Sequence, residues 1–383
     1  MFKYVSFSLP HGGESRRIEL VEDEVPIKEF INTFKTRQIY QYVQHSHMAR
    51  WQDLQFRSSR DTFPIGVILS VIDFAENYTF SPQKEIQSQY YHSEQVSILV
   101  HVSYRHAEEH IDGIQSTVEQ RIVIKEAHFY ISDDSDHDTL FVQHSFNIFL
   151  DSLIKDRGAN FKEHWVWSDG CAGQFKSARS FFWLCRLHCN IKIQHTWSFF
   201  ESGHGKGEHD GAGACIKRAL RRYQMQFDAD TMRDAKSVVD WCTHNLCQDH
   251  NDRSDKFVHR FFWHITDIDR EHAYTCKTVP GTSSLHSIRS TDHTYWVLHI
   301  REHACYCPYC TGNEFQDPCV NIQQGFVEEW RQTILEPLDR VGINQVHIPN
   351  EDIDEGSQFS SDYYIILGLV CEGMHKYTYF LKY

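Results

Sequence analysis

The stretch FPIGVILSVIDFAENYTF, residues 63–80, places an acidic residue, Asp73, inside a long apolar run. The run is too continuous for a strand with one solvated face, and it predicts a strand buried on both faces. A carboxylate is costly in such a place because burial removes its hydration. The pattern recurs in EHWVWSDG, residues 163–170, where Asp169 closes an apolar run just before a glycine. Both carboxylates therefore need a compensating partner.

The other apolar patterns surround these two runs in a recognisable order, with three strands first and strands alternating with helices afterwards. The predicted elements are strands at 63–80, 93–106, 120–134, 163–170 and 190–202, and helices at 28–59, 138–158, 176–189 and 210–224. Consecutive strands favour an antiparallel meander, and alternation with helices favours parallel strands added to the same sheet. This order resembles the ribonuclease-H-like fold. We therefore expect an α/β protein with a mixed five-stranded sheet, flanking helices, N-terminal helices and a C-terminal zinc-stabilised region.

Five regions follow from these patterns. They are an N-terminal helical region (1–60), a ribonuclease-H-like domain (61–230), a helical connecting region (231–300), a cysteine-rich segment (301–345) and a small strand-rich module (346–383). The net charge of −14 argues against a surface that binds nucleic acid all over, but it leaves room for a local basic groove. No signal segment follows Met1, so we expect an intracellular protein whose 12 cysteines are reduced or metal-bound.

The candidate catalytic residues are acidic and follow the carboxyl ends of the predicted strands. Asp73 lies in the first strand, Asp169 closes the fourth, and Asp210 opens the helix after the fifth, with Glu208 as the alternative third acid. Such strand ends are where α/β sheets build their sites. Carboxylates brought together repel each other unless a cation binds, and oxygen ligands suit Mg²⁺ or Mn²⁺. We expect two such ions. The acidic turn 133–138 is expected to be a loop and helix cap instead.

Four segments carry a family resemblance: IDFAENY (72–78), HFYISDDSDHDT (128–139), WSDGCAGQFKS (167–177) and ESGHGKGEHDGAGACIKR (201–218). Over residues 28–225 the chain resembles the catalytic domain of DDE-type DNA transposases, the cut-and-paste enzymes of mobile elements. The resemblance implies a metal-binding triad of Asp73, Asp169 and Asp210, with Asp in place of Glu at the third position. It also implies a nuclear nuclease and strand transferase that acts on DNA ends, and it allows a homodimer.

Basic residues near these acids are candidates for contact with the DNA backbone. They are Lys176, His204, Lys206, Lys217 and Arg218. Phosphate contacts of this kind position nucleic acid without reading its sequence. A solvated loop at 204–207 and a solvated helix face at 217–223 are the plainer interpretations.

The segment HACYCPYCTGNEFQDPC, residues 303–319, predicts a structural zinc site. Cys307 and Cys310 form a C-x-x-C pair that suits tetrahedral zinc. Cys319 is expected as a third ligand, with Cys305 or His303 as the fourth.

Three functions from different classes remain open at this point. The first is a metal-dependent DNA transposase. The second is a domesticated or inactive descendant that binds DNA or protein, which the acidic charge and the lack of a recognisable N-terminal DNA-binding domain favour. The third is an unrelated zinc-stabilised interaction protein in which the aspartates only cap helices.

Overall fold

The structure is a computed structural model, and it describes a set of segments that covers most of the first 338 residues. The described residues are 2–8, 14–20, 26–80, 94–205, 207–226, 232–247, 258–271, 275–291, 296–312 and 318–338. Residues 1–338 form one compact unit. The strand-rich module predicted at 346–383 lies outside the described residues.

The described part of the chain contains a mixed sheet of nine strands in the order β11-β10-β9-β7-β6-β3-β4-β5-β8. The strands are β3 (Val67–Thr79), β4 (Gln95–His106), β5 (Val123–Ser132), β6 (Glu163–Ser168), β7 (Gln194–Phe199), β8 (Val258–His264), β9 (Ser287–Ser290), β10 (Val297–Arg301) and β11 (Arg331–Ile334). The meander β3-β4-β5 is antiparallel, and β6 and β7 join it in parallel. β8 pairs with β5 in parallel, whereas β9, β10 and β11 are antiparallel to their neighbours.

All five predicted strands are present as β3 to β7, but the sheet has nine strands rather than the five expected. Within the described residues of the region 231–300, the helical elements are α8 (Ala235–Leu246) and the short η4 (Thr282–Ser284), and the region adds β8, β9 and β10 to the same sheet. These strands are short, so their apolar periods are too brief to read from the sequence. In the N-terminal region 1–60, ahead of the helix predicted at 28–59, β1 (Phe2–Ser8) and β2 (Glu14–Leu20) pair as an antiparallel hairpin that was not predicted.

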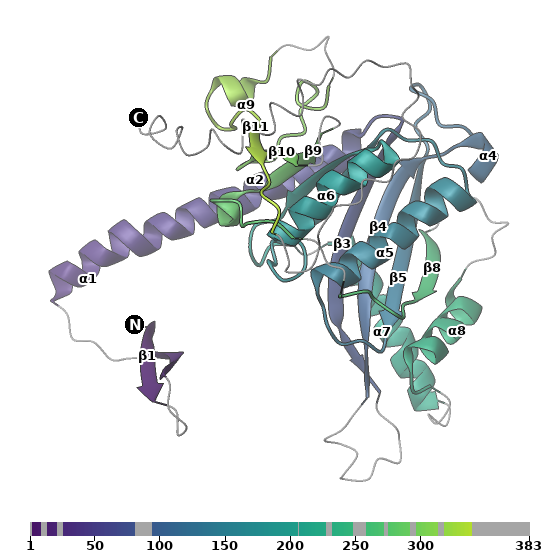
Figure 1. The fold of residues 1–383 in the computed structure, drawn as a ribbon, viewed down its shortest axis with the longest axis horizontal. Helices are drawn as coiled ribbons and strands as arrows, with labels where there is room; N and C mark the ends of the chain where they lie inside the picture. Colours follow the sequence, from purple (N-terminus) through teal and green to yellow (C-terminus); the bar gives the residue numbers. More distant parts are fainter. Residues whose placement is uncertain are drawn as a thin grey trace. The chain divides into compact units, whose positions relative to one another are not determined.

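Helices cover both faces of the sheet (Figure 1). The helical elements are α1 (Ile27–Thr33), the π-helical η1 (Phe34–Ile39), α2 (Tyr40–Thr62), α4 (Glu109–Asp112), α5 (Thr139–Asp151), the π-helical η2 (Ser152–Asp156), α6 (Ala178–Ile191), α7 (Glu208–Gln226), α8, η4 (Thr282–Ser284) and α9 (Val320–Gln323). No helix among the described residues is both long and apolar enough to cross a membrane. The start of α5 agrees with the expected cap, because Asp138 accepts a hydrogen bond from the Phe141 N–H at 2.8 Å.

Alternation along β3 divides its side chains between two apolar layers. Ile68 and Ile72 pack in the layer that includes α5 and α6, whereas Leu69 and Val71 pack in the layer that includes α2, α7 and α8. The same two-residue period continues to Asp73 and directs it to the α7 side. The apolar run is continuous because both faces of β3 are covered, as the sequence predicts.

Buried histidines line the α5 side of the sheet. His101 and His164 both lie within hydrogen-bond distance of the Ser70 hydroxyl, at 2.7 and 2.8 Å. Burial lowers the pKa of His101 and His164 well below the usual value and lowers the pKa of His128; it lowers the pKa of His195 to about 3. A hydroxyl can donate to one imidazole and accept from the other, so the folded state holds this pair neutral.

These histidines predict a loss of stability in mild acid. The unfolded chain binds protons below a pH of about 6.5 and the folded chain does not, so the free energy of unfolding falls as the pH drops through that value. Each buried neutral imidazole contributes a loss of about 2 kcal/mol between pH 7 and pH 5. Urea denaturation at the two pH values measures this loss. A His164→Gln variant should show a shallower dependence on pH, and equal unfolding free energies at pH 7 and pH 5 would contradict the assignment.

Candidate functional site

Asp73 and Asp169 occupy equivalent positions on two neighbouring strands. The parallel ladder between β3 and β6 runs from Val67↔Glu163 to Val71↔Trp167. Two residues beyond the last pair, β3 carries Asp73 and the chain after β6 carries Asp169. β3 continues alongside β4 after it loses its β6 neighbour, so the sheet opens on one side of Asp73. The strand register, not local sequence, places the two carboxylates at equivalent positions on neighbouring strands, although Asp169 is not among the ligand atoms that gather within 4.8 Å of one another around Asp73.

Their charges act on each other. Burial raises the pKa of Asp169, and the charge of Asp73 raises it further. The Cys171 N–H opposes this rise by donating to Asp169 Oδ1 at 3.0 Å, and His209 opposes it through its charge. Asp73 accepts a hydrogen bond from the Phe74 N–H at 2.8 Å. A cation placed between the two carboxylates would remove the repulsion.

The first turn of α7 contributes a third acid, and the structure distinguishes the two candidates. Glu208 forms ion pairs with Lys125 and, at 3.7 Å, with Arg60. Asp210 instead groups with Asp73 and His209, whose ligand atoms all lie within 4.8 Å of one another. Asp210 therefore joins Asp73, and Glu208 is bound to basic groups from β5 and α2.

α7 reaches the sheet closely enough to hold this group because it carries a glycine at the contact. A Cβ atom at Gly213 would lie 3.2 Å from Ala75 Cβ and 3.4 Å from Val100 Cγ2. The loop before the helix lies beside Asp169, since a Cβ atom at Gly205 would be in ordinary contact with Asp169 Cβ at 3.5 Å. Close approach of the backbone at these positions sets the distance between Asp210 and the strand carboxylates.

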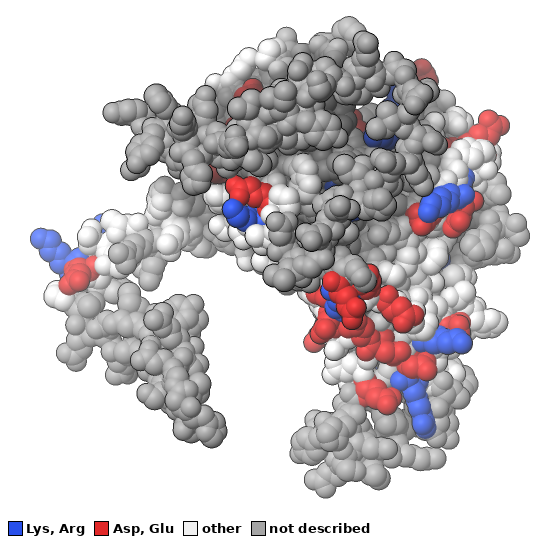
Figure 2. Space-filling view, viewed as in Figure 1, with Lys and Arg blue, Asp and Glu red and all other residues white. Residues whose placement is uncertain are grey.

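The predicted basic contacts differ in their surroundings. Lys217 donates to the Glu76 carbonyl at 3.1 Å, and Arg218 is exposed on α7. His204 lies 3.1 Å from His45 between Nε2 atoms. Lys206 lies outside the described residues. On the face drawn in Figure 2, acidic side chains gather near the start of α5.

Lys176 is buried rather than surface-exposed. Only 6% of the residue is exposed, and its Nζ donates to the Ser283 carbonyl at 2.9 Å. Burial lowers the pKa of Lys176 to about 8, and the charge of Glu201 acts in the opposite direction. Its direct contact with a DNA backbone remains a prediction.

A pocket of about 700 Å³ lies beside Asp169. Its lining includes Lys176, Glu201 and His286. Glu201 accepts hydrogen bonds from His286 at 2.9 Å and from His45 at 3.0 Å; burial alone would raise its pKa, but these contacts lower it. Sequence reasoning missed Glu201, although it follows β7 much as Asp169 follows β6. It also missed His209, whose only sequence signal is its position beside Asp210.

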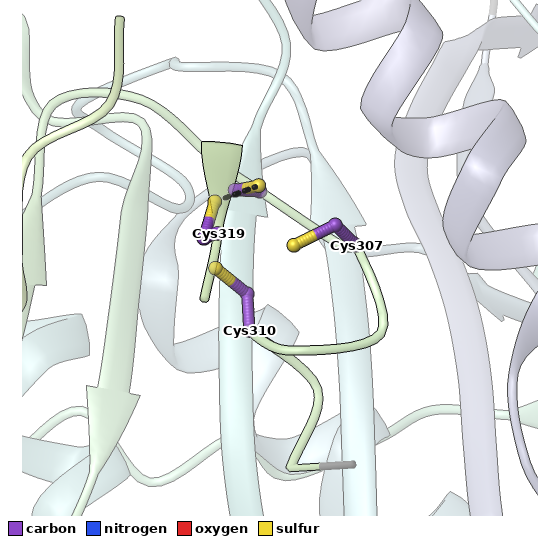
Figure 3. A group of neighbouring side chains, drawn as sticks. Cys307, Cys310 and Cys319 are labelled. Carbon is purple, nitrogen blue, oxygen red and sulfur yellow. Dashed lines mark hydrogen bonds between the residues drawn. The ribbon is translucent and has the colours of Figure 1, made fainter. Parts of the chain in front are cut away.

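Four cysteines form a second candidate metal centre. Sulfur atoms of Cys305, Cys307, Cys310 and Cys319 all lie within 4.8 Å of one another. Figure 3 shows the side chains of Cys307, Cys310 and Cys319 directing their sulfurs toward one another. The Cys310 thiol donates to Cys305 and, against the effect of burial, holds the pKa of Cys305 down to about 5. Four thiolates that converge in this way suit tetrahedral zinc.

Of the two candidates for the fourth ligand, Cys305 belongs to the cluster. The alternative, His303, directs Nδ1 toward Glu328 at 2.9 Å and is not part of the cluster. The sequence could not separate the two because both lie within a few residues of the C-x-x-C pair. Their positions depend on how the chain leaves β10, which local spacing does not encode.

The cysteine segment also fastens α2 to the sheet. Trp51 donates to the Ala304 carbonyl at 2.8 Å. Gln52, which is fully buried, donates to the Phe199 carbonyl at 2.8 Å and accepts from the Ala304 N–H at 3.2 Å. The cluster thus stabilises the helix that packs against the end of β7, next to Glu201.

Gly213 provides a test of the α7 contact. Gly213→Val should lower the Tm and weaken divalent-metal binding, because the new side chain would meet Ala75 and Val100. Gly211→Val is the matched control, since a Cβ atom at Gly211 meets nothing within 4 Å and both changes share the helix propensity of valine. Equal Tm values for the two variants would show that the contact does not restrict the helix.

Removal of one thiolate provides a test of the cysteine cluster. Cys310→Ser should abolish stoichiometric zinc in the purified protein and lower the free energy of unfolding by at least about 3 kcal/mol, because a structural zinc site contributes its binding energy to folding. Zinc analysis by mass spectrometry and urea denaturation measure both effects. Cys215→Ser, at an exposed position on α7, should retain zinc and stability. Full zinc content in the Cys310→Ser protein would refute the assignment.

Comparison with curated proteins and with solved structures gave no match. Residues 52–301 match a family described as a domain of unknown function, DUF8701. The matched region runs from α2 to β10 and includes Asp73, Asp169 and α7, while the four cysteines follow it. Since the match spans more than half of the 383 residues, the chain belongs to the DUF8701 family.

Proposed function

We propose that this protein carries out metal-dependent phosphoryl transfer on DNA, with Asp73, Asp169 and Asp210 as its metal-binding acids. One observation carries the proposal. Two neighbouring buried strands place carboxylates at equivalent positions, Asp73 within β3 and Asp169 just after β6, and a third carboxylate from a helix start meets Asp73. Asp169 lies outside that group of ligand atoms, but the charge of Asp73 acts on it. Caps and turns alone would not require the acids of β3 and α7 to meet beside it.

The order of the central strands supports a ribonuclease-H-like catalytic fold of the kind found in DDE-type transposases. Within the larger sheet, β5-β4-β3-β6-β7 combines an antiparallel meander with two parallel additions. The resemblance of the sequence implies the same arrangement. The additional strands on either side extend this core without interrupting it.

The residues at the site fit divalent cations. Their donor atoms are carboxylate oxygens and one imidazole nitrogen. The pKa of Asp169 is raised because burial penalises its negative charge. When bound, such ions activate an attacking water or 3′-hydroxyl and stabilise the leaving oxygen. Asp73 and Asp169 would hold the metal from the strands, and Asp210 would do so from the N-terminus of α7. The Gly207 N–H donates to Asp210 Oδ2 at 2.8 Å and orients that carboxylate.

DNA would approach the three carboxylates of the site, so DNA binding should depend on the divalent cation. Arg218, Arg221 and Arg222 are exposed on α7 and are the candidates for phosphate contact. A phosphodiester beside three carboxylates is repelled until divalent ions neutralise them. A protein that acts on chromosomal DNA would work where that DNA lies, which in a eukaryotic cell is the nucleus.

A second candidate is a descendant of such an enzyme that binds DNA or protein without cleavage. It is favoured by the internal contacts of two residues that the resemblance assigns to DNA. Lys217 donates to Glu76, and Lys176 donates to Ser283. Both side chains would need to leave these partners to reach a phosphate.

Nicking of supercoiled plasmid DNA in Mg²⁺ or Mn²⁺ tests the proposal. Asp169→Asn and Asp73→Asn should each reduce the nicking rate by at least about 100-fold, because each removes charge that holds the metal at the reacting phosphate. Asp53→Asn, which breaks only an exposed pair with Arg57 on α2, should nick at the original rate.

Circular dichroism would verify that the variants fold. Nicking that persists in Asp169→Asn would exclude the proposed mechanism. DNA binding by the unaltered chain without any nicking would select the inactive descendant.

A further inference from the structure

We propose that His209 is a direct ligand in the acidic site and that it makes the site select Mn²⁺ over Mg²⁺. The inference deepens the proposed function, because it names the class of cation that the same site prefers. Mg²⁺ is a hard cation that takes oxygen ligands and keeps its waters. Mn²⁺ shares its preference for carboxylates but is a first-row transition metal, the class of ion that imidazole nitrogen binds.

The burial of His209 is the first observation. Only 3% of the residue is exposed, although it lies in the first turn of a helix beside the half-exposed Asp210. Neither ring nitrogen has a hydrogen-bond partner, and both are inaccessible to solvent. Orphaned polar atoms of this kind are rare in native proteins and call for an explanation, such as an ion that the protein binds.

The direction of the ring is the second observation. Nε2 lies 3.7 Å from Asp73 Oδ2 and 3.5 Å from Asp210 Oδ2. These separations are too long for good hydrogen bonds. They suit an ion pair of a protonated ring, and they also allow the three groups to bind one cation. All three ligand atoms fall within 4.8 Å of one another. A cation would therefore satisfy the nitrogen and neutralise both carboxylates.

The ring is held in this direction by its surroundings. A Cβ atom at Gly207 would lie 3.3 Å from His209 Cε1 and Nδ1, so the backbone of Gly207 lies against that edge. Nε2, which is bonded to Cε1, faces the two carboxylates. The close packing of α7 at Gly213 restricts the helix that carries both His209 and Asp210. The geometry is thus built before any ion binds.

The test uses the full chain with zinc already bound, so that thiolates do not compete for the added metal. The affinity for Mn²⁺ is measured from the EPR signal of free Mn²⁺, and the affinity for Mg²⁺ is measured by competition. The unaltered protein should bind Mn²⁺ at least about tenfold more tightly than Mg²⁺. His209→Gln should weaken Mn²⁺ binding by about tenfold or more and Mg²⁺ binding by less than about threefold. His110→Gln, at an exposed position on α4, should change neither.

A spectroscopic measurement on the unaltered protein keeps the inference testable if the variant folds poorly. Pulsed EPR of bound Mn²⁺ should show coupling to a coordinated nitrogen, and the coupling should change when histidine is labelled with ¹⁵N. Binding of Mn²⁺ that requires Asp73 but shows no nitrogen coupling would overturn the role of His209 and leave the proposed function standing. If neither Asp73→Asn nor His209→Gln changes Mn²⁺ binding, the role of His209 and the proposed function are both overturned.

Discussion

The parallel pairing of β3 with β6 is the constraint on which the rest of the structure depends. Both strands are covered by apolar layers on both faces, so their register is fixed by burial. A slip of one residue would turn Asp73 from the α7 side into the aromatic layer beneath α5. The same register that completes the core therefore sets the separation of Asp73 and Asp169.

Elements on both sides of the sheet reinforce this arrangement. α7 packs through Gly213 against β3 and β4, which brings Asp210 and His209 to the strand acids. On the far side of β6, the four cysteines tie α2 to the end of β7 through Gln52 and Ala304. The described part of the chain thus carries two groups of side chains that could hold a metal ion, one of thiols and the other of carboxylates and an imidazole.

Much of the fold could be predicted from the sequence. The strands β3 to β7 and the helices α5, α6 and α7 lie where apolar periodicity indicated, because their runs are long enough for the period to be read. The hairpin at 2–20 and the short strands β8 to β11 were not predicted. Short strands are stabilised by the sheet they join, and nothing in a run of four to seven residues indicates that partner.

The same distinction applies to the candidate site, where the sequence predicted some features and the tertiary structure decided others. The sequence by itself placed Asp73 inside one buried strand and Asp169 at the end of another, since the cost of burying a carboxylate is visible in the apolar run, and it predicted Cys307 and Cys310 as a ligand pair. Only the tertiary structure decided that Asp210 rather than Glu208 joins Asp73, that Cys305 rather than His303 completes the cluster, and that His209 turns inward. Local patterns report burial and spacing along the chain. Which of two neighbouring side chains meets a distant partner depends on strand register and helix docking.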